Sequence, residues 1–552
     1  MQKSIFRATA LTLLMTTAGF AFAASGALPV EKLSADVVVV GAGGTGVAAA
    51  ASAAQHGAKV IVFEKMPFIG GSSALAGGAI AAGDTKPQAR AGEKETTSEG
   101  FMKIWLNDQK RSYRGGSKAY PDEALVKSMT FAFTDTINWL EEVVGHTFAK
   151  PRPFGYGGPN YAHAPSESPV PASGRGSSPA GGRFVIKNVK LYLDKMGVPV
   201  RTATPVTDLI QNDKGEVVGV KASDKKTVYE VSAKAVVLAT GGFAHNKEMM
   251  ERLVPVYAPY TDKSVATVGA TGDGIRMAVK AGGVEYEDAW VIGLYVSGAK
   301  PEYSKTFTSK DKYKDRVFVN EKGERFVNED LPYLTDPVAM QKAVWAIVDS
   351  QDPKKVEVLN GVQDPKISVK ANSWKELGDA LGVPAEALEK TMTDYNRACE
   401  TGDDKTFGKP KAFLKPFNKA PFYAVRVIPQ TGGTMGGVKV DDHFRVIDKA
   451  GKPIKGLYAG GEVINRPYYN RVYTSSASPT PRVVLRASTP RRKHSGSNAG
   501  EEGADKLPRP DLKTVPGGGR SDSDGLSSYA DKPSWKKGTA NFNDVKLNGV
   551  KI

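Results

Sequence analysis

The sequence is short of several features that define common functional classes. It has a single cysteine, Cys399, which cannot form an internal disulfide, and no C-x-x-C-H motif that would attach haem. Its six histidines are widely spaced and do not show the spacing of metal ligands. From these absences we expect neither a metal site nor a haem in this chain.

The chain also lacks a basic helix or stripe, although its net charge is +16. Residues 475–552 hold 14 Lys and Arg against 8 Asp and Glu, which accounts for +6 of that charge, and the remainder is scattered. Nucleic acid is therefore not an expected partner. With 552 residues, 40% of them hydrophobic, the chain can bury a large core and form more than one domain.

The N-terminus carries a short hydrophobic run preceded by basic residues. Lys3 and Arg7 precede ALTLLMTTAGFAFA (residues 10–23), and Ala21-Phe22-Ala23 offers small residues where a signal peptidase would cut. The run is too short for a membrane-spanning helix, and no other stretch approaches that length. We expect residues 1–23 to be a signal peptide, the mature protein to be periplasmic, and no membrane insertion.

A dinucleotide-binding pattern follows in ADVVVVGAGGTGVAAAASAAQHGAKVIVFEK (residues 35–65). It reads as an apolar strand, a glycine turn, an alanine-rich helix, a second strand and an acid. The glycines of G-x-G-x-x-G permit the turn, admit a pyrophosphate and allow close helix–strand packing, in that order. The acid after the second strand is placed to bind ribose hydroxyls.

Further glycine-rich turns indicate which dinucleotide is bound. FIGGSSALAGGAIAA (68–82) directly follows the acid and can wrap the pyrophosphate and ribityl chain of a flavin. The remaining turns are AVVLATGGF (235–243), TGDGIRMAVKAGG (271–283), TGGTMGGVKVD (431–441) and GLYAGGEV (456–463). Together and in this order they resemble the FAD-dependent fumarate reductase and succinate dehydrogenase flavoprotein family, especially its exported flavocytochrome c and urocanate-reductase-like branch. The resemblance covers about residues 35 to 475.

The resemblance implies an α/β fold, in which a Rossmann-like FAD-binding domain carries an inserted α+β capping domain. The expected boundaries are 32–288 and 421–475 for the FAD-binding domain and 289–420 for the capping domain. DRVFVNEKGERFVNE (315–329) matches a family hallmark within the cap. The active site would lie between the cap and the FAD-binding domain.

The family motifs also imply the residues that hold noncovalent FAD. The adenosine half would be held by Gly41, Gly43, Gly46 and Glu64. The central phosphates and flavin would be lined by Ser72, Ser73, Gly77 and Gly78. Acids that contact the cofactor hydroxyls would be Asp273 and Glu462, and the adenine side would be closed by Thr240, Gly241 and Gly242.

That branch of the family reduces a carbon–carbon double bond conjugated to a carboxylate. Hydride leaves flavin N5, a cationic residue supplies the proton, and arginine binds the carboxylate. Arg471 falls where the family's asparagine–arginine pair binds substrate carboxylate. The proton donor is expected a few residues before VNEKG, where ungapped counting favours Lys312 and residue chemistry favours Arg316, which we prefer.

Two departures from the family argue against fumarate as the substrate. Gly433 stands where fumarate reductases have a histidine, and WVIGLYVS (290–297) replaces a second one. Trp290 and Tyr295 either widen an aromatic pocket or pack in the core, and Tyr295 is also a candidate catalytic residue beside Arg316, Arg471 and Lys312. A larger, aromatic or heterocyclic unsaturated acid is therefore expected. His163 lies near a family histidine motif, and a purely structural role is an equal alternative.

Electrons must reach the flavin from outside this chain, because no haem motif is present. A separate small c-type cytochrome is the expected donor. Two alternatives stay open: an FAD-dependent dehydrogenase that introduces a double bond, as the related 3-ketosteroid dehydrogenases do, and a non-catalytic product that does not retain flavin. TGGTMGGVKVD resembles the 3-ketosteroid dehydrogenases as well.

After about Ser475 the family pattern stops. The family continues into a glycine-rich helix start and an SGR-IAG-like stretch, whereas this chain reads SSASPTPRVVLRASTPRRKH (475–494). If each triplet from Ala477 to Ala487 begins one base earlier, the constrained bases permit GLAYASGRIAG, which is the missing motif. We therefore expect residues 476–552 to be either a frame-shifted tail or a native disordered one.

Overall fold

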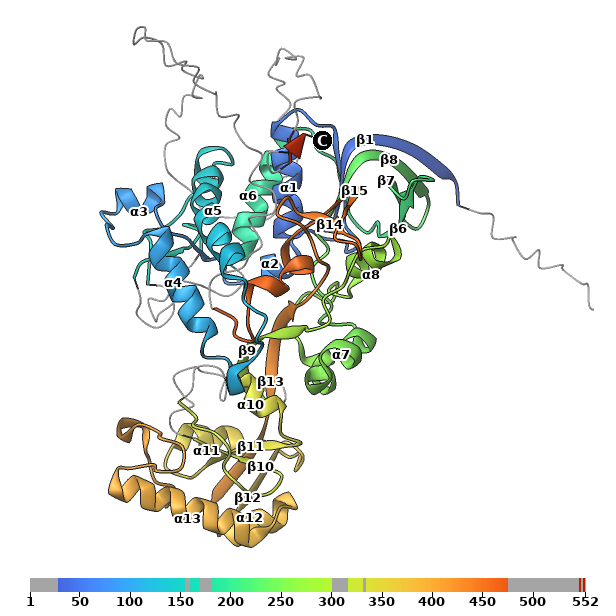
Figure 1. Ribbon diagram of the computed structural model, residues 1–552. Helices are drawn as coiled ribbons and strands as arrows, with labels where there is room; N and C mark the ends of the chain where they lie inside the picture. Colours follow the sequence, from blue (N-terminus) through green and yellow to red (C-terminus); the bar gives the residue numbers. More distant parts are fainter. Residues whose placement is uncertain are drawn as a thin grey trace, which may run out of the picture.

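The computed structural model describes residues 28–153, 159–168, 181–299, 316–330 and 334–474, together with two short strands near the C-terminus. In this part of the chain, a larger and a smaller body are joined by a narrow ribbon of strands (Figure 1). The predicted signal peptide, Lys312 and nearly all of the tail lie outside the described residues.

An eight-stranded sheet forms the centre of the larger body, in the order β14-β15-β8-β1-β2-β5. The neighbours from β15 to β5 run parallel, β14 is antiparallel to β15, and β6 and β7 extend antiparallel from β8. The strands are β1 (Val30–Val40), β2 (Val60–Phe63), β5 (Val200–Arg201), β6 (Val206–Gln211), β7 (Val217–Ser223), β8 (Val228–Leu238), β14 (Arg445–Ile447) and β15 (Pro453–Ala459). This is the predicted Rossmann-like arrangement, with β1 between β2 and β8.

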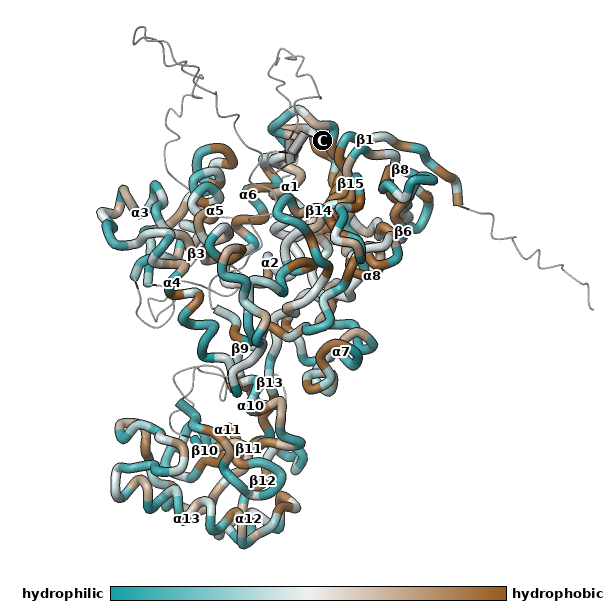
Figure 2. The backbone as a smooth tube through the Cα atoms, in the orientation of Figure 1, coloured by the Kyte–Doolittle hydropathy of each residue, from teal (hydrophilic) through white to brown (hydrophobic). Residues whose placement is uncertain are grey.

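The central strands are apolar because helices or loops cover both faces of a parallel sheet. Val37, Val38 and Val39 on β1 are completely buried, and hydrophobic residues mark the strands around β15 in Figure 2. The helices of the larger body are α1 (Gly44–Gln55), α2 (Gly71–Leu75), α3 (Lys86–Arg90), α4 (Ser98–Gln109), α5 (Glu123–Glu142), α6 (Gly182–Lys195), α7 (Lys247–Leu253) and α8 (Asp273–Lys280). Short 3₁₀ turns are η1 (Tyr113–Gly115), η2 (Pro255–Lys263), η5 (Gly461–Ile464) and η6 (Arg466–Tyr468).

The smaller body is an antiparallel sheet backed by helices, as the predicted α+β cap requires. Its sheet order is β10-β11-β13-β12, and β13 also pairs with β9. The strands are β9 (Trp290–Gly298), β10 (Val317–Asn320), β11 (Val344–Val348), β12 (Ser368–Ala371) and β13 (Phe422–Met435). The helices are α10 (Thr335–Ala339), α11 (Pro353–Asn360), α12 (Trp374–Leu381) and α13 (Ala385–Thr401), followed by the turn η4 (Lys411–Phe413). Leu377, Leu388 and Met392 pack against β10 and β11 in its core.

The predicted domain boundary at 289 falls at the beginning of β9, whereas the one at 421 falls at the beginning of β13, still within the cap sheet. β13 starts in the cap sheet, where Arg426 lies opposite Trp345 of β11. It then leaves that sheet and pairs with β9 from Val427 opposite Gly298 to Met435 opposite Trp290, through two register shifts. Both connections between the bodies are therefore strands hydrogen-bonded to each other, and no loose linker is present at either boundary.

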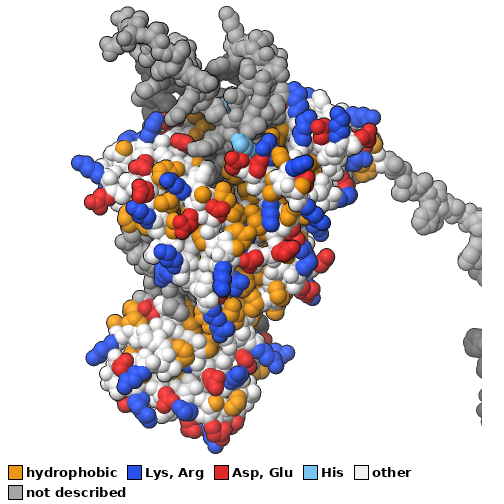
Figure 3. Space-filling view, in the orientation of Figure 1, with side chains coloured by type: hydrophobic (Ala, Val, Ile, Leu, Met, Phe, Trp, Pro, Cys, Tyr) orange, Lys and Arg blue, Asp and Glu red, His pale blue; other side chains and the backbone are white. Residues whose placement is uncertain are grey.

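Charged residues of both signs are interspersed over the face shown in Figure 3, in agreement with the scattered charge of the sequence. Across the described residues, no helix combines the length and the hydropathy that a membrane span needs. Two further pairs of short strands complete the structure: β3 (Ile80–Ala81) with β4 (Ala162–His163), and β16 (Lys546–Leu547) with β17 (Val550–Lys551).

His163 has a structural role at the β3–β4 pair. The side chain is completely buried, its Nδ1 hydrogen-bonds the carbonyl of Ile80 at 3.1 Å, and its Nε2 lies 2.7 Å from the Thr85 hydroxyl. A carbonyl only accepts, so Nδ1 carries the proton of the neutral ring. Burial lowers the pKa of His163 to about 4, and it lowers the pKa of His146 to about 4 as well.

We expect these two histidines to make the fold sensitive to mild acid. Their folded pKa lies below the unfolded value, so between about pH 6.5 and pH 4 the unfolded chain binds protons that the folded chain does not. Stability is then complete above pH 6.5 and falls by up to about 3 kcal/mol for each histidine as the pH approaches 4. Urea unfolding of FAD-saturated protein at pH 7.5 and pH 4.5 measures the loss. His163→Gln should show a smaller loss than the wild type, and an equal loss in both would contradict the assignment.

Candidate cofactor and substrate site

The three glycines after β1 have three separate roles in the structure. Gly41 has a φ of +100°, and a Cβ there would lie 2.5 Å from the carbonyl oxygen of Ala239. A Cβ at Gly46 would lie 1.8 Å from the carbonyl oxygen of Gly41, so this glycine lets α1 approach the loop. At Gly43 the nearest atom would be 4.0 Å away. Only the second glycine therefore faces open space, beside the N-terminus of α1, where a pyrophosphate is stabilised.

That open space belongs to a cavity of about 890 Å³, which is within the usual size range of cofactor sites. Every predicted FAD residue except Gly46 and Gly242 lines it: Gly41, Gly43, Glu64, Ser72, Ser73, Gly77, Gly78, Thr240, Gly241, Asp273 and Glu462. The cavity therefore joins segments from both parts of the larger body, as a site for FAD requires.

Two acidic residues at the cavity, Glu64 and Asp273, form hydrogen bonds or ion pairs with neighbouring groups of the protein. Glu64 accepts hydrogen bonds from the backbone N–H groups of Ala42 and Met66, both at 2.8 Å, and so fixes the glycine loop. Asp273 pairs with Lys65 at 2.5 Å and with Arg276 at 2.6 Å. Burial alone would raise the pKa of Asp273, but the hydrogen bond and charge of Lys65 outweigh it and lower the pKa. Asp273 therefore remains ionised, and both carboxylates can accept from cofactor hydroxyls with their other lone pairs.

Glu462 is the exception among these acids, because burial raises its pKa. Its Oε1 accepts from the backbone N–H of Thr434 at 2.7 Å and from the Thr434 hydroxyl at 3.0 Å. These bonds fasten η5 to the TMGG turn. Gly433, in the same turn, has a φ of +156°, and a Cβ there would lie 2.7 Å from Glu462 Oε1. This backbone therefore has no room for the histidine of the fumarate reductases.

The second glycine and serine loop is tied to its neighbours by its serines. Ser73 Oγ accepts from the backbone N–H of Gly44 at 3.2 Å, at the start of α1. Ser72 Oγ accepts from the backbone N–H of Thr267 at 3.0 Å. Both hydroxyls thus stand where two glycine loops meet and also line the cavity.

One end of the cavity is aromatic. Tyr295 of β9 and Tyr473 line it together with Leu294, Gly432 and Asn465. Burial raises the pKa of Tyr295, so its phenol is neutral at physiological pH. Trp290 is not among the lining residues and packs in the core of the larger body. The two aromatic residues left open by the sequence thus have different positions, Tyr295 at the cavity and Trp290 in the core.

Arg471 stands near this end and stacks on Trp290. Its guanidinium carbon is 4.1 Å from the centre of the Trp290 ring, and its Nη2 is 3.9 Å from Asp288 Oδ1. The Arg471 side chain is 26% exposed, and its Nε is buried without a hydrogen-bond partner among the described residues. Arg471 does not itself line the 890 Å³ cavity, but it lies two residues before Tyr473, which does.

Sequence reasoning missed the residues that hold the Arg471 loop. Arg466 is completely buried, pairs with Asp288 at 2.8 Å and donates to the carbonyl of Asn470 at 3.1 Å. Asp288 also accepts from the Ser117 hydroxyl at 2.7 Å. Burial acts to raise the pKa of Asp288, but Ser117 and Arg466 outweigh it and lower the pKa. The nearby repeat of Asn-Arg in INRPYYNR was the available signal, although nothing in the sequence linked it to Asp288.

The structure does not bring Arg316 to the cavity. Arg316 is completely buried in the smaller body just before β10, and its carbonyl accepts from Lys409 Nζ at 2.8 Å. The neighbouring family hallmark is explained by ion pairs. Arg325 binds Glu329 through two hydrogen bonds of 2.8 Å and Asp404 at 2.8 Å, and Lys409 lies 3.3 Å from Glu329. These buried charges fix the start of β10, and a proton-donating role for Arg316 or Lys312 stays a prediction.

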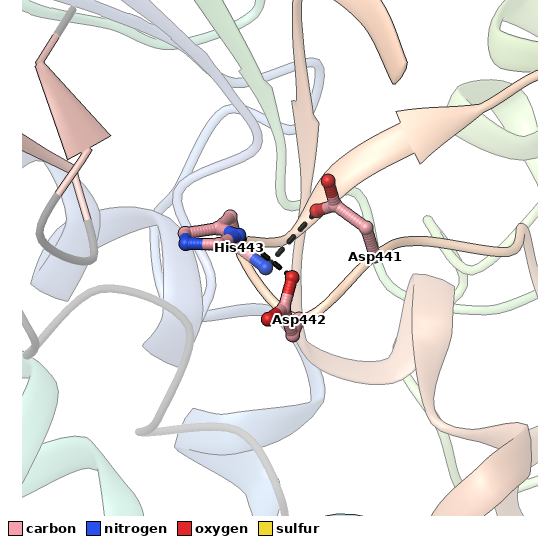
Figure 4. A group of neighbouring side chains, drawn as sticks. All are labelled: Asp441, Asp442 and His443. Atoms are coloured by element: carbon pink, nitrogen blue, oxygen red, sulfur yellow. Dashed lines mark hydrogen bonds and ion pairs between the residues drawn. The ribbon is translucent and has the colours of Figure 1, made fainter. Parts of the chain in front are cut away.

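Three neighbouring side chains before β14 could in principle offer metal ligands: Asp441, Asp442 and His443 (Figure 4). Asp441, however, pairs with Arg445 at 2.6 Å and accepts from the backbone N–H groups of His443 and Arg445. Asp442 pairs with His443 Nδ1 at 2.6 Å. Their interactions are those of a charged turn.

Comparison with known proteins agrees with this geometry. The FAD binding domain family model matches residues 36–476. A fumarate reductase (cytochrome) of Shewanella frigidimarina is 32% identical over 436 residues, which are 78% of this chain and 72% of that protein. A urocanate reductase of Eggerthella lenta is 29% identical over 444 residues, which are 77% of this chain and 69% of that protein.

A solved structure shows the same likeness in three dimensions. The open conformation of a flavocytochrome c3 fumarate reductase aligns with a TM-score of 0.62 at 30% identity, over 82% of this chain and 78% of that one. The sequence match, the strand order and the lined cavity all lead to the same assignment. The chain belongs to the FAD-dependent fumarate reductase and succinate dehydrogenase flavoprotein family, binds FAD and is an oxidoreductase that acts on CH–CH groups.

Proposed function

We propose that the protein reduces the carbon–carbon double bond of an α,β-unsaturated carboxylate that is larger than fumarate and carries an aromatic or heterocyclic group. The observation that supports this substrate is the aromatic part of the cavity lining, which Tyr295 and Tyr473 provide. Planar unsaturated groups pack well against such rings. Gly433 removes the polar contact that a histidine would offer to a second carboxylate.

Arg471 is the residue that binds the substrate carboxylate in this proposal. Guanidinium matches a carboxylate with two parallel hydrogen bonds, and its Nε has no partner among the described residues. Asp288, at 3.9 Å, is too distant for a hydrogen bond and leaves that edge of Arg471 available. Stacking on Trp290 holds the guanidinium plane in one orientation.

Tyr295 is the proton-supplying residue in this proposal, and its position in the cavity lining supports that role. Burial raises its pKa, so the phenol keeps its proton at neutral pH and can hold the proton that the substrate carbon takes up. Bound FAD supplies the hydride. Closure of the cap over this site would exclude water from it and so protect the reduced cofactor.

We further propose that the protein is periplasmic and takes electrons from a separate c-type cytochrome. The N-terminal pattern of residues 1–23 supports export, and the lack of a C-x-x-C-H motif in this sequence supports a donor in another chain. The second candidate is a dehydrogenase that introduces a double bond, because a 3-oxosteroid 1-dehydrogenase of Mycolicibacterium smegmatis is 27% identical over 530 residues. Reduction and oxidation assays with the same carbon skeletons distinguish the two directions.

The binding of FAD should depend on Gly43 and the fold on Gly46. Gly43→Ala puts a methyl group into the open space beside α1, so we expect normal stability but at least about a tenfold loss of FAD affinity, equal to about 1.4 kcal/mol. Gly46→Ala is the matched control, because its Cβ meets the Gly41 carbonyl and should destabilise the apoprotein. Flavin absorbance and urea unfolding measure the two effects. Wild-type protein that stays colourless after FAD reconstitution would refute cofactor binding.

A panel of enoates should identify the substrate class. Wild-type enzyme with a reduced dye is assayed with fumarate, acrylate, urocanate and cinnamate, and we expect the cyclic acids to give the highest kcat/KM and fumarate a low one. The reason is the aromatic cavity end and the lack of a histidine at Gly433. Efficient fumarate turnover would contradict the proposed specificity, and oxidation of the saturated acids without reduction of any enoate would favour the dehydrogenase.

Substitutions should separate carboxylate binding from proton supply. Arg471→Lys keeps the charge but loses the two-pronged contact, so kcat/KM should fall by about 1–3 kcal/mol of transition-state stabilisation. Tyr295→Phe should lower kcat with little change in KM. The control is Arg252→Lys, at a surface pair with Glu285, which should behave like the wild type. Unchanged kcat/KM in Arg471→Lys would rule out Arg471 as the residue that binds the substrate carboxylate.

A further inference from the structure

A buried polar cluster lies where the smaller body meets the larger one. Asp336 of α10 is 5% exposed, and its Oδ1 accepts from the Tyr257 hydroxyl at 2.5 Å and from Trp290 Nε1 at 3.1 Å. Tyr257 belongs to η2 and Trp290 begins β9. One carboxylate oxygen therefore holds two aromatic donors that come from two other elements.

The guanidinium of Arg471 packs against the ring of Trp290. The guanidinium carbon lies 4.1 Å from the Trp290 ring centre, well within the range of a cation–π contact. The Tyr257 ring meets Trp290 edge-on, with centroids 5.7 Å apart. The indole is thus fixed by a hydrogen bond at its N–H and by a ring at its side, and its plane decides the plane of Arg471.

The cluster crosses the boundary between the two cores. Leu334 and Val338, which flank Asp336, pack in a core of the smaller body with Val296 and Val427, whereas Tyr257 and Trp290 pack in the core of the larger body. α10 also lies directly on β9, since a Cβ at Gly293 would be 2.2 Å from Thr335 Oγ1. A shift of α10 therefore moves the anchor of Trp290.

We propose that Asp336 is a positioning residue that couples the placement of the cap to the orientation of Arg471, through Trp290. This inference rests on the proposed role of Arg471 in holding the substrate carboxylate. When the cap packs against the larger body, Asp336 holds the Trp290 indole and the indole orients the Arg471 guanidinium. When α10 moves away, Trp290 loses its hydrogen bond to Asp336 and the guanidinium of Arg471 is no longer held in one orientation.

The coupling is tested on KM for fumarate, acrylate, urocanate and cinnamate with a reduced dye. Trp290→Leu should raise KM about tenfold, within the strength of a desolvated cation–π contact, with kcat within twofold. In the Arg471→Gln background the same substitution should change KM by less than twofold. Asp336→Ala should resemble Trp290→Leu, and Asp336→Asn should restore KM, because its amide oxygen still accepts from both donors. Asp349→Asn, at a buried cap aspartate bound to the turn at Asn418, is the control.

Equal effects of Trp290→Leu in both backgrounds, or an unchanged KM in Asp336→Ala, would overturn the coupling. If Asp336→Ala does not fold, the Trp290 cycle still decides the question. If the wild type reduces no enoate, the proposed function fails. The wild type, Trp290→Leu, Arg471→Gln and the double variant are then compared by the urea concentrations at their unfolding midpoints. Non-additive midpoints would then support the contact between Trp290 and Arg471, and additive ones would refute it.

Discussion

The antiparallel pairing of β9 with β13 is the constraint on which the substrate end of the site depends. β9 carries Trp290 and Tyr295, and β13 carries the glycine turn around Gly433 after it leaves the cap sheet. Two register shifts interrupt the pairing at Gln430–Thr434, directly beside the cavity. Such irregularities re-aim side chains next to functional sites. A single ribbon therefore joins the bodies, places the tyrosine and leaves the turn open to the cofactor.

Buried charge organises the rest of the site. Asp288 is shared between Arg466 and Ser117 and lies near Arg471, so it connects the loop after η6 to the segment after η1. In the cap, Glu329 binds Arg325 and lies close to Lys409 at the start of β10. Burying such groups is costly unless each finds its partner. Both networks accordingly occur where segments distant in sequence must meet in one geometry.

The sequence predicted the cofactor half of the site better than the substrate half, for a physical reason. Glycine motifs act locally: the turn, the helix start and the acid all lie within one strand–helix–strand unit, so spacing alone identifies Gly43 and Glu64. The position of Arg471 depends on ion pairs between residues distant in sequence, such as Asp288 and Arg466, and no local sequence pattern predicts such pairs. From its residue type, Trp290 could line the pocket or pack in the core, and only the three-dimensional packing shows that it lies in the core. Arg316 was chosen by chemistry, yet it lies buried in the cap.

The turn at Gly433 also bears on which substitutions the site can accept. A side chain at this position would meet the Glu462 carboxylate, which Thr434 holds through two hydrogen bonds. A single codon change to histidine would therefore strain the turn before it offered a new contact. To accommodate a histidine here, the protein must first shift Glu462, a residue that also lines the cofactor cavity. A substitution at Gly433 is therefore coupled to the cofactor site and not to the substrate end alone.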